Sequence, residues 1–177
     1  NADAAVSGVK YACSQLSAQG GADAAHAIMT TDTVPKLEVE QFEIGGQIVT
    51  AAAMAKGAAM LSPAMATMLC LIATDAAIEQ SLLQKALHAA LPNSFHSMVV
   101  DGCRSTNDTV FLLANGEAKN PIINDADSAA YKDFAGAIAQ VCESIAMQMA
   151  QDAEGSTKFM MVSVHGARNE TDARLAA

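Results

Sequence analysis

The chain carries one hydroxyl at a junction where it could act as a nucleophile. Thr67 follows a loop that holds Lys56, Gly57 and Pro63, and it directly precedes the apolar run 68–74. Proline restricts the backbone φ angle, and a short apolar run bounded by turn residues is typical of a buried strand. A hydroxyl at the start of a rigid strand can be aimed at a substrate. The competing interpretation is a threonine that merely begins a strand, which is the commoner role for this pattern.

A threonine hydroxyl needs a base that removes its proton before it can attack. The α-amino group of the same residue can be that base if the residue begins a chain. Its reference pKa is about 8, against about 10.4 for a lysine side chain, so an appreciable fraction is neutral at physiological pH. Nucleophilic catalysis by this hydroxyl therefore requires a free amino terminus at Thr67.

Composition and charge narrow the class of protein. The chain has 177 residues, of which 51% are hydrophobic and 16% charged, enough for one domain with a sizeable core. Its formal net charge of -9 argues against nucleic acid or an anionic membrane as a partner, because either would require a basic face. No apolar run has the length of a bilayer span, and the first residues do not form a signal peptide. We therefore expect a cytoplasmic protein that binds a small molecule or another protein.

The four cysteines do not indicate a metal site or a disulfide framework. They lie far apart in the sequence, with no Cys-x-x-Cys pair and no histidine at a metal-ligand spacing. We expect reduced thiols. They are Cys13, Cys70, Cys103 and Cys142.

Hydrophobic periodicity and turn residues predict a mixture of helices and strands. The predicted helices cover 2–19, a segment capped by Asp75 that runs to Leu91, 126–150, and a last segment that begins at Asn169. The predicted strands cover 26–29, 39–44, 47–55, 68–74, 95–100, 110–114 and 158–164. Several hairpins between helices predict an α+β fold, a layered α/β sandwich with mixed sheets, as one domain.

Three blocks of sequence resemble a known family. They are Ala-Ile-Met-Thr-Thr-Asp-Thr at 27–33, Met-Ala-Lys-Gly-Ala-Ala-Met-Leu-Ser-Pro-Ala-Met-Ala-Thr-Met-Leu at 54–69, and Val-Asp-Gly-Cys-Arg-Ser-Thr-Asn-Asp-Thr at 100–109. The chain resembles the ornithine acetyltransferase family, also called glutamate N-acetyltransferase, over nearly all its length. Chains of that family extend past both ends of this one.

The resemblance implies an N-terminal-nucleophile fold of the DmpA and ornithine-acetyltransferase type, and a single incomplete domain over 1–177. In that family the precursor cuts itself, which here would be at the Ala66–Thr67 bond. Residues 1–66 would end the α chain and 67–177 would begin the β chain, giving an α/β heterodimer and a higher oligomer. Thr67 would then carry acetyl from N2-acetylornithine to glutamate. No metal or redox cofactor is implied, and use of acetyl-CoA as a substrate is left open.

The resemblance also assigns substrate contacts. Thr30 matches a substrate-contacting threonine, Lys56 a lysine for the substrate α-carboxylate, and Glu154 a glutamate that could pair with the ornithine δ-ammonium. Each also has an ordinary structural explanation, namely a loop hydroxyl, a solvated lysine and a solvated carboxylate. The polar residues Asp101, Asn107 and Asp108 are interpreted as turn formers that at most support the site.

Some of the family's catalytic parts have no counterpart in this sequence. Its oxyanion-binding Thr-Gly pair lies upstream of the region that matches residue 1, and further substrate contacts lie near its C-terminus. Inside the matched blocks, Ala58-Ala59 and Cys103-Arg104 depart from the usual pattern. We therefore do not expect the 177 residues alone to form a complete active site. Two alternatives stay open: a related N-terminal-nucleophile aminopeptidase or amidohydrolase, and a catalytically silent fragment.

Overall fold

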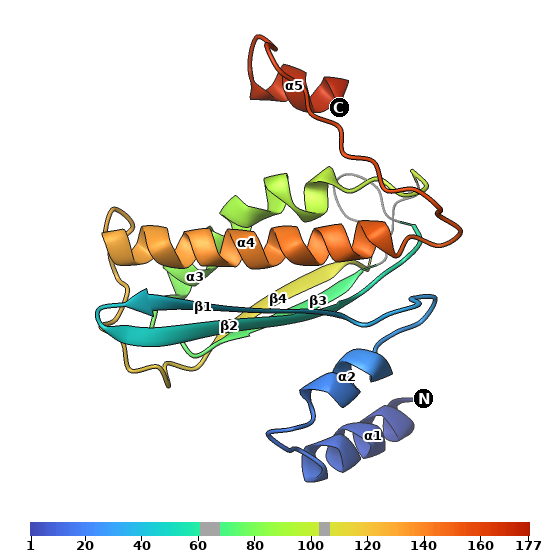
Figure 1. Ribbon diagram of the computed structural model, residues 1–177. Helices are drawn as coiled ribbons and strands as arrows, with labels where there is room; N and C mark the ends of the chain where they lie inside the picture. The colour runs from blue at the N-terminus through green and yellow to red at the C-terminus, as the bar shows by residue number, and fades with distance from the viewer. Residues whose placement is uncertain (61–67, 103–106) are drawn as a thin grey trace.

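A four-stranded mixed sheet forms the centre of the molecule (Figure 1). The computed structural model describes residues 1–60, 68–102 and 107–177. The strands lie in the order β1-β2-β3-β4, with β1–β2 and β2–β3 antiparallel and β3–β4 parallel. Their bounds are Lys36–Ile44 for β1, Gln47–Lys56 for β2, Leu69–Thr74 for β3 and Thr109–Ala114 for β4.

The β1–β2 hairpin follows from its turn. Gly45 and Gly46 both have positive φ, at 59° and 81°, and they join a ladder that closes with Ile44 opposite Gln47. Two-residue hairpin turns require this left-handed backbone, and glycine adopts it without strain. The predicted hairpin is therefore confirmed.

The parallel pairing of β3 with β4 requires a crossover connection. That connection holds α3 (Gln80–Ala90) and two short 3₁₀ helices, η1 (Leu91–Asn93) and η2 (Phe95–Ser97). Both strands therefore start at the same edge of the sheet.

The strand register gathers four strand ends at that edge. Lys36, which begins β1, lies opposite Ala55, and Lys56, which ends β2, lies opposite Leu69 at the start of β3. Leu69 in turn pairs with Thr109, the first residue of β4. We call this side of the sheet the Lys56 edge.

Helices α3 and α4 cover one face of the sheet (Figure 1). α4 (Ala129–Gln151) begins at Ser128, whose hydroxyl accepts a hydrogen bond from the Tyr131 amide. Its apolar residues recur every three or four positions, so one stripe faces the sheet and is buried. This stripe includes Phe134, Ile138, Val141, Ile145 and Met149. The predicted long helix and the layered α+β architecture are both confirmed.

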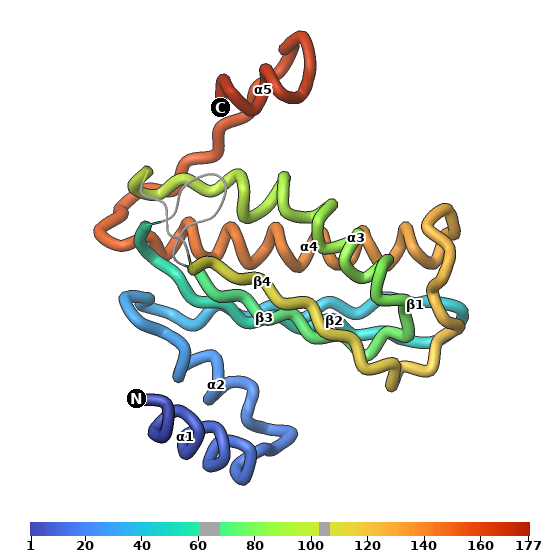
Figure 2. Tube along the Cα trace, turned by 180° about the vertical axis from the view of Figure 1, so that it is seen from behind, coloured from blue at the N-terminus to red at the C-terminus, as the bar shows by residue number. Residues whose placement is uncertain are grey.

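The other sheet face is apolar and largely open. Helices α1 (Ala2–Ser14) and α2 (Gly21–Ala27) lie on that side, and α2 contacts β2 (Figure 2). The exposed apolar side chains on the strands include Leu37, Val39, Ile48, Leu69, Phe111 and Leu113. Beyond α4, α5 (Glu170–Ala176) contacts η1, because Arg174 donates a hydrogen bond to the Pro92 carbonyl at 2.7 Å. The predicted helical segment that begins at Asn169 is confirmed as α5.

Two predictions near the N-terminus are wrong. The strand over 26–29 is replaced by the end of α2, because the alanines of 21–27 favour helix over the short apolar pair that follows. The helix over 2–19 ends at Ser14 rather than at the glycine pair. There the Ser14 hydroxyl donates to the Tyr11 carbonyl and the Gln15 amide makes a tighter bond to Ala12, which ends the regular pattern.

Three further predictions are wrong. The strand over 95–100 is largely occupied by η2, where the Ser97 hydroxyl donates to the Pro92 carbonyl. Residues 158–164 form no strand, because no strand in the described part of the chain pairs with them. Asp75 does not cap α3. Its carboxylate accepts a hydrogen bond from the Thr50 amide at 2.7 Å, and the helix begins after Glu79.

Substitution of the hairpin glycines tests this turn. A Cβ on Gly45 would approach the Pro121 ring at 2.7 Å, whereas one on Gly46 meets nothing within 4 Å. We expect Gly45→Ala to lower the free energy of unfolding by about 2–3 kcal/mol, from strain plus the clash with a stiff ring. Gly46→Ala serves as the control, with backbone strain alone at about 1 kcal/mol. Urea unfolding measures both, and equal losses would contradict the contact with Pro121.

Candidate functional site

The predicted nucleophile Thr67 and its cleavage partner Ala66 lie outside the described residues. The site is therefore built from the described residues on either side of them. Lys56 precedes this stretch at the end of β2, and Met68 follows it directly before β3. Both stand at the Lys56 edge, where the strand register already joins the two strands.

Two of the predicted substrate-binding residues are in contact. The Lys56 Nζ donates to the Thr30 Oγ1 at 3.4 Å, although 26 positions separate them in sequence. Thr30 lies in the loop between α2 and β1. An ammonium and a hydroxyl side by side can both donate hydrogen bonds to one carboxylate. Their role in binding stays a prediction.

The third predicted residue reaches the same region through its backbone. Glu154 lies three positions beyond the end of α4, and its amide donates to the Ala58 carbonyl at 2.6 Å. This bond holds the segment after α4 against the loop that follows β2. The Glu154 side chain is exposed, so its carboxylate is accessible to a ligand.

A buried ion cluster adjoins the backbone of Thr30 and of Gly57, which follows Lys56. Lys36 is fully buried, and its Nζ donates to the Asp32 Oδ1 at 2.6 Å and also to Asp152. Asp152 ends α4, while Asp32 belongs to the loop that carries Thr30. We call Asp32, Lys36 and Asp152 the Lys36 cluster.

The Lys36 cluster connects the segments that carry the predicted site residues. Asp32 accepts hydrogen bonds from the Gly57 amide at 2.7 Å and from the Thr30 amide at 3.1 Å. Asp152 accepts from the Thr33 amide at 2.9 Å and from the Thr33 hydroxyl. The loop before β1, the end of β2 and the end of α4 are therefore held to one buried ammonium.

The hydrogen bonds of this cluster stabilise the charged form of its carboxylates. Burial by itself raises the pKa of Asp32, but the Gly57 amide, Lys36 and the Thr30 amide outweigh it and lower that pKa below its ordinary value. Burial also raises the pKa of Asp152, but hydrogen bonds from Lys36 and Thr33 outweigh it and lower that pKa to about 2. Both groups are therefore carboxylates at neutral pH.

Asp108 is a residue that sequence reasoning treated only as a turn former. Its Oδ1 accepts a hydrogen bond from the Met68 amide at 2.7 Å, and its buried Oδ2 has no hydrogen-bond partner among the described residues. Burial raises the pKa of Asp108, against the opposing effects of the Met68 amide and the charge of Lys56. In the sequence, Asp108 lies directly before β4. That position indicates a contact with Met68 only when β4 is known to pair with β3.

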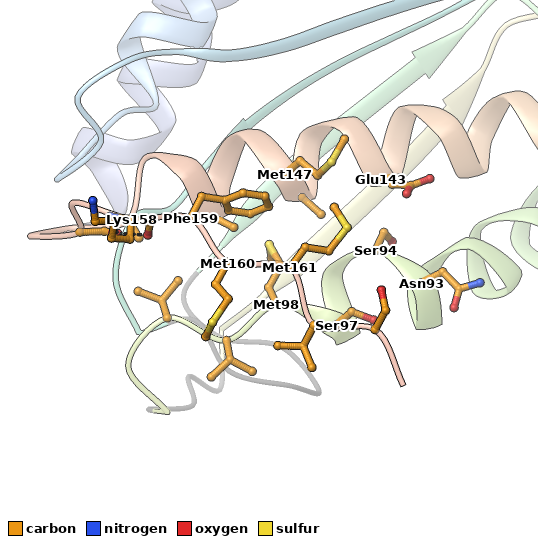
Figure 3. Close-up of a pocket in the computed structure, with 18 of the residues that line it drawn as sticks. Asn93, Ser94, Ser97, Met98, Glu143, Met147, Lys158, Phe159, Met160 and Met161 are labelled. Atoms are coloured by element: carbon orange, nitrogen blue, oxygen red, sulfur yellow. Dashed lines mark hydrogen bonds between the residues drawn. The ribbon is translucent and has the colours of Figure 1, made fainter. Parts of the chain in front are cut away.

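A cavity of about 640 Å³ lies beside Glu154. It is bordered by α4, by the region of η1 and η2, and by the segment after α4. Figure 3 shows Met98, Met147 and Met161 around it. Of the predicted substrate contacts, Glu154 lines this cavity, whereas Thr30 and Lys56 do not.

The His, Cys, Asp and Glu side chains of the described residues were compared with the spacing of metal sites and disulfides. No group of three His, Cys, Asp or Glu side chains among residues 1–60, 68–102 and 107–177 is placed to hold a metal ion. Cys13, Cys70 and Cys142 are free thiols, and Cys103 lies outside the described residues. In the same part of the chain, no helix is both long and apolar enough to cross a membrane.

Comparison with known families decides the relationship. The model of the ArgJ family matches residues 1–177. The chain belongs to the ArgJ family. Two relatives, both named arginine biosynthesis bifunctional protein ArgJ, come from Symbiobacterium thermophilum and Lactococcus lactis. The first is 50% identical over 99% of this chain, and the second 49% identical over 93% of it.

A solved structure supports the same relationship. The crystal structure of the arginine biosynthesis bifunctional protein ArgJ from Bacillus halodurans is 38% identical, with a TM-score of 0.57 over 60% of this chain and 50% of its own. This ArgJ-family chain spans only 43% and 42% of the length of the two curated relatives. The two relatives therefore contain residues that have no counterpart among these 177.

Removal of the buried ammonium tests the Lys36 cluster. We expect Lys36→Met to lower the free energy of unfolding by about 3–5 kcal/mol, because it leaves two carboxylates in the interior without their cation. The control is Arg168→Met, which removes an exposed ion pair with Asp172 at 3.9 Å and should change that free energy by less than about 1 kcal/mol. Urea unfolding compares them, and similar losses would contradict the structural role of Lys36.

The same cluster predicts acid sensitivity. The pKa values of Asp32 and Asp152 are lowered in the folded state, so their stabilising effect is present above about pH 4. It is lost as the pH falls toward about 2, the folded-state pKa of Asp152. We expect Asp152→Asn to show a smaller fall in unfolding free energy over this range than the unsubstituted protein. Denaturant unfolding at several pH values checks this, and parallel curves would argue against it.

Proposed function

We propose that this chain carries the nucleophile and part of the substrate pocket of an acetyltransferase. In the proposed reaction, acetyl moves from N2-acetylornithine to glutamate through an ester on Thr67. The contact between Lys56 and Thr30 is the observation that carries the proposal. It places a cation and a hydroxyl at the edge where β3 begins, two residues after Thr67. Membership of the ArgJ family and the names of the relatives, which refer to arginine biosynthesis, support the same reaction.

The proposed chemistry begins with hydrolysis of the Ala66–Thr67 bond. The Thr67 hydroxyl attacks the Ala66 carbonyl and displaces the Thr67 nitrogen. Water then cleaves the resulting ester, which leaves a carboxylate on Ala66 and frees the α-amino group of Thr67. That amine takes the proton of the Thr67 hydroxyl as the hydroxyl oxygen attacks the acetyl carbonyl. The bond from the carbonyl carbon to the ornithine nitrogen then breaks, and the leaving amine receives the proton. The amino group of glutamate attacks the resulting ester and restores the hydroxyl. Neither half-reaction needs a metal or a redox cofactor.

The described residues suggest how the amino acid is held. Lys56 and Thr30 together bind the substrate α-carboxylate, and Glu154 pairs with the δ-ammonium of ornithine. The hydrogen bond from the Glu154 amide to the Ala58 carbonyl holds the Glu154 backbone beside the loop that follows Lys56. In this proposal, the two products of cleavage stay together as an α/β heterodimer.

Intact-mass spectrometry and an acetyl-transfer assay on the complete protein test the proposal. We expect two chains, the second beginning at Thr67, and an isotope-labelled acetyl group on that residue during turnover. Thr67→Ala should give one uncut chain and reduce transfer by at least about a thousandfold, because it removes the attacking oxygen. Thr171→Ala removes an exposed threonine of α5 and should leave both results unchanged.

Each result has a distinct meaning. Transfer by Thr67→Ala at the unsubstituted rate would refute the proposed nucleophile. Release of free acetate without N-acetylglutamate would replace the transferase with a hydrolase of the same chemistry. A single uncut mass in an active protein would refute the proposed base. Assays with acetyl-CoA as the only donor decide separately whether it serves as a second source of acetyl.

A further inference from the structure

The two side chains proposed to bind the substrate α-carboxylate come from segments that are held by one buried acid. The Lys56 Nζ donates to the Thr30 Oγ1 at 3.4 Å, across 26 positions of sequence. Asp32 lies two residues after Thr30, and its side chain is fully buried. Hydrogen bonds from both segments meet on its carboxylate, which can therefore fix the separation of the two backbones.

Each oxygen of Asp32 holds a different segment. Oδ2 accepts a hydrogen bond from the Thr30 amide at 3.1 Å, whereas Oδ1 accepts one from the Gly57 amide at 2.7 Å. Oδ1 also accepts from the Lys36 Nζ at 2.6 Å, which supplies the opposite charge that a buried carboxylate needs. An ionised carboxylate has two acceptor oxygens and no donor. An asparagine at this position would keep one acceptor oxygen and would present a donor to the other amide.

The bond to Gly57 fixes the backbone directly after Lys56. Gly57 has a φ of 147°, in the region that residues with a side chain rarely adopt. At this turn β2 has just ended, and the Gly57 amide donates to Asp32. The next residue, Ala58, is also held, because its carbonyl accepts a hydrogen bond from the Glu154 amide at 2.6 Å. The chain that follows Lys56 is therefore fixed at two successive residues.

The other acid of the Lys36 cluster provides a comparison within the same structure. Asp152 also pairs with Lys36, but its further hydrogen bonds in the described part of the chain come from Thr33 and Val34. The two acids therefore share one cation and hold different parts of the loop before β1. Of the two, Asp32 is the acid that also binds the end of β2.

We propose that Asp32 is a positioning residue for the α-carboxylate site, an inference that rests on the proposed function above. It holds the Thr30 and Gly57 backbones so that the Thr30 hydroxyl and the Lys56 ammonium can donate to one substrate carboxylate. Two donors that are held in place before the ligand arrives bind it with a smaller loss of entropy. Asp32 thereby sets the affinity for an amino acid carboxylate and takes no part in the transfer of acetyl.

Kinetics of Asp32→Asn in the complete protein test this role. We expect KM for N2-acetylornithine to rise by at least about tenfold with kcat within about twofold, because the loss falls on binding and not on the chemical step. Asp152→Asn is the matched control, since it removes the other carboxylate on Lys36, and its KM should change far less. A purely structural role of Asp32 would reduce the amount of folded enzyme, and so the apparent kcat, at an unchanged KM.

The α-carboxamide analogue of N2-acetylornithine isolates the group that is recognised. It lacks the α-carboxylate, so Asp32→Asn should raise the KM of this analogue by less than about twofold, which closes a cycle between the residue and the substrate group. A rise of equal size for both substrates would show that Asp32 does not act through the carboxylate contacts, and it would overturn the proposal.

Asp32→Glu guards against a folding defect in the asparagine variant. It keeps the charge beside Lys36 but displaces both oxygens, so KM for N2-acetylornithine should again rise. Unchanged KM in a folded variant overturns the positioning role. If the unsubstituted protein does not transfer acetyl, the proposed function fails and this inference fails with it. Normal transfer by the unsubstituted protein, with unchanged KM in the variants, refutes the role of Asp32 alone.

Discussion

A lysine ammonium with no exposure to water requires carboxylates around it, and this requirement organises the Lys56 edge. Lys36 begins β1 and is fully buried, with Asp32 on one side and Asp152 on the other. Replacement of a buried ion pair by apolar side chains is often neutral for stability, so such a cluster is weak evidence of a more stable protein. Its clearer effect is geometric, because the loop before β1 and the end of α4 have to meet where the ammonium lies.

This constraint extends to the predicted substrate contacts. Asp32 also accepts hydrogen bonds from the Thr30 and Gly57 amides. The backbone on both sides of the Lys56–Thr30 contact is therefore linked to Lys36 through Asp32. The Lys56 side chain is long and flexible and that of Thr30 is short and stiff, and the backbone that carries both is held by hydrogen bonds to Asp32. A ligand that met these two side chains would therefore lose less entropy in ordering the backbone around them.

Periodicity predicted the elements whose pattern is long and whose turns are distinctive. The hairpin depends on a glycine pair and α4 on an apolar stripe that recurs regularly along its 23 residues, and both were found. Short apolar segments failed because alternating and helical patterns cannot be told apart over four residues. Residues 158–164 have the composition of a strand, but a strand needs a neighbour, and none of the described strands pairs with them.

Sequence reasoning likewise found some residues of the candidate site and missed others. Thr30, Lys56 and Glu154 were identified through resemblance, and the structure brings the first two into contact. Lys36 and Asp108 were missed because their importance depends on partners 116 and 40 positions away. A lysine in a polar stretch is usually solvated and an aspartate before a strand usually forms a turn, so local patterns favour the wrong environment for both.

The antiparallel ladder between β2 and β3 determines what a break in the chain between them would do. Residues 51–56 pair with 69–74, and the core contains Val49 from one side of such a break and Ile72 and Ile138 from the other. The two pieces would remain one folded body without a covalent link. Refolding from the denatured state would then be a second-order reaction between two polypeptides, and the midpoint of thermal unfolding would rise with protein concentration. Dilution, which has no effect on the folding of a continuous chain, would become a way to weaken the fold.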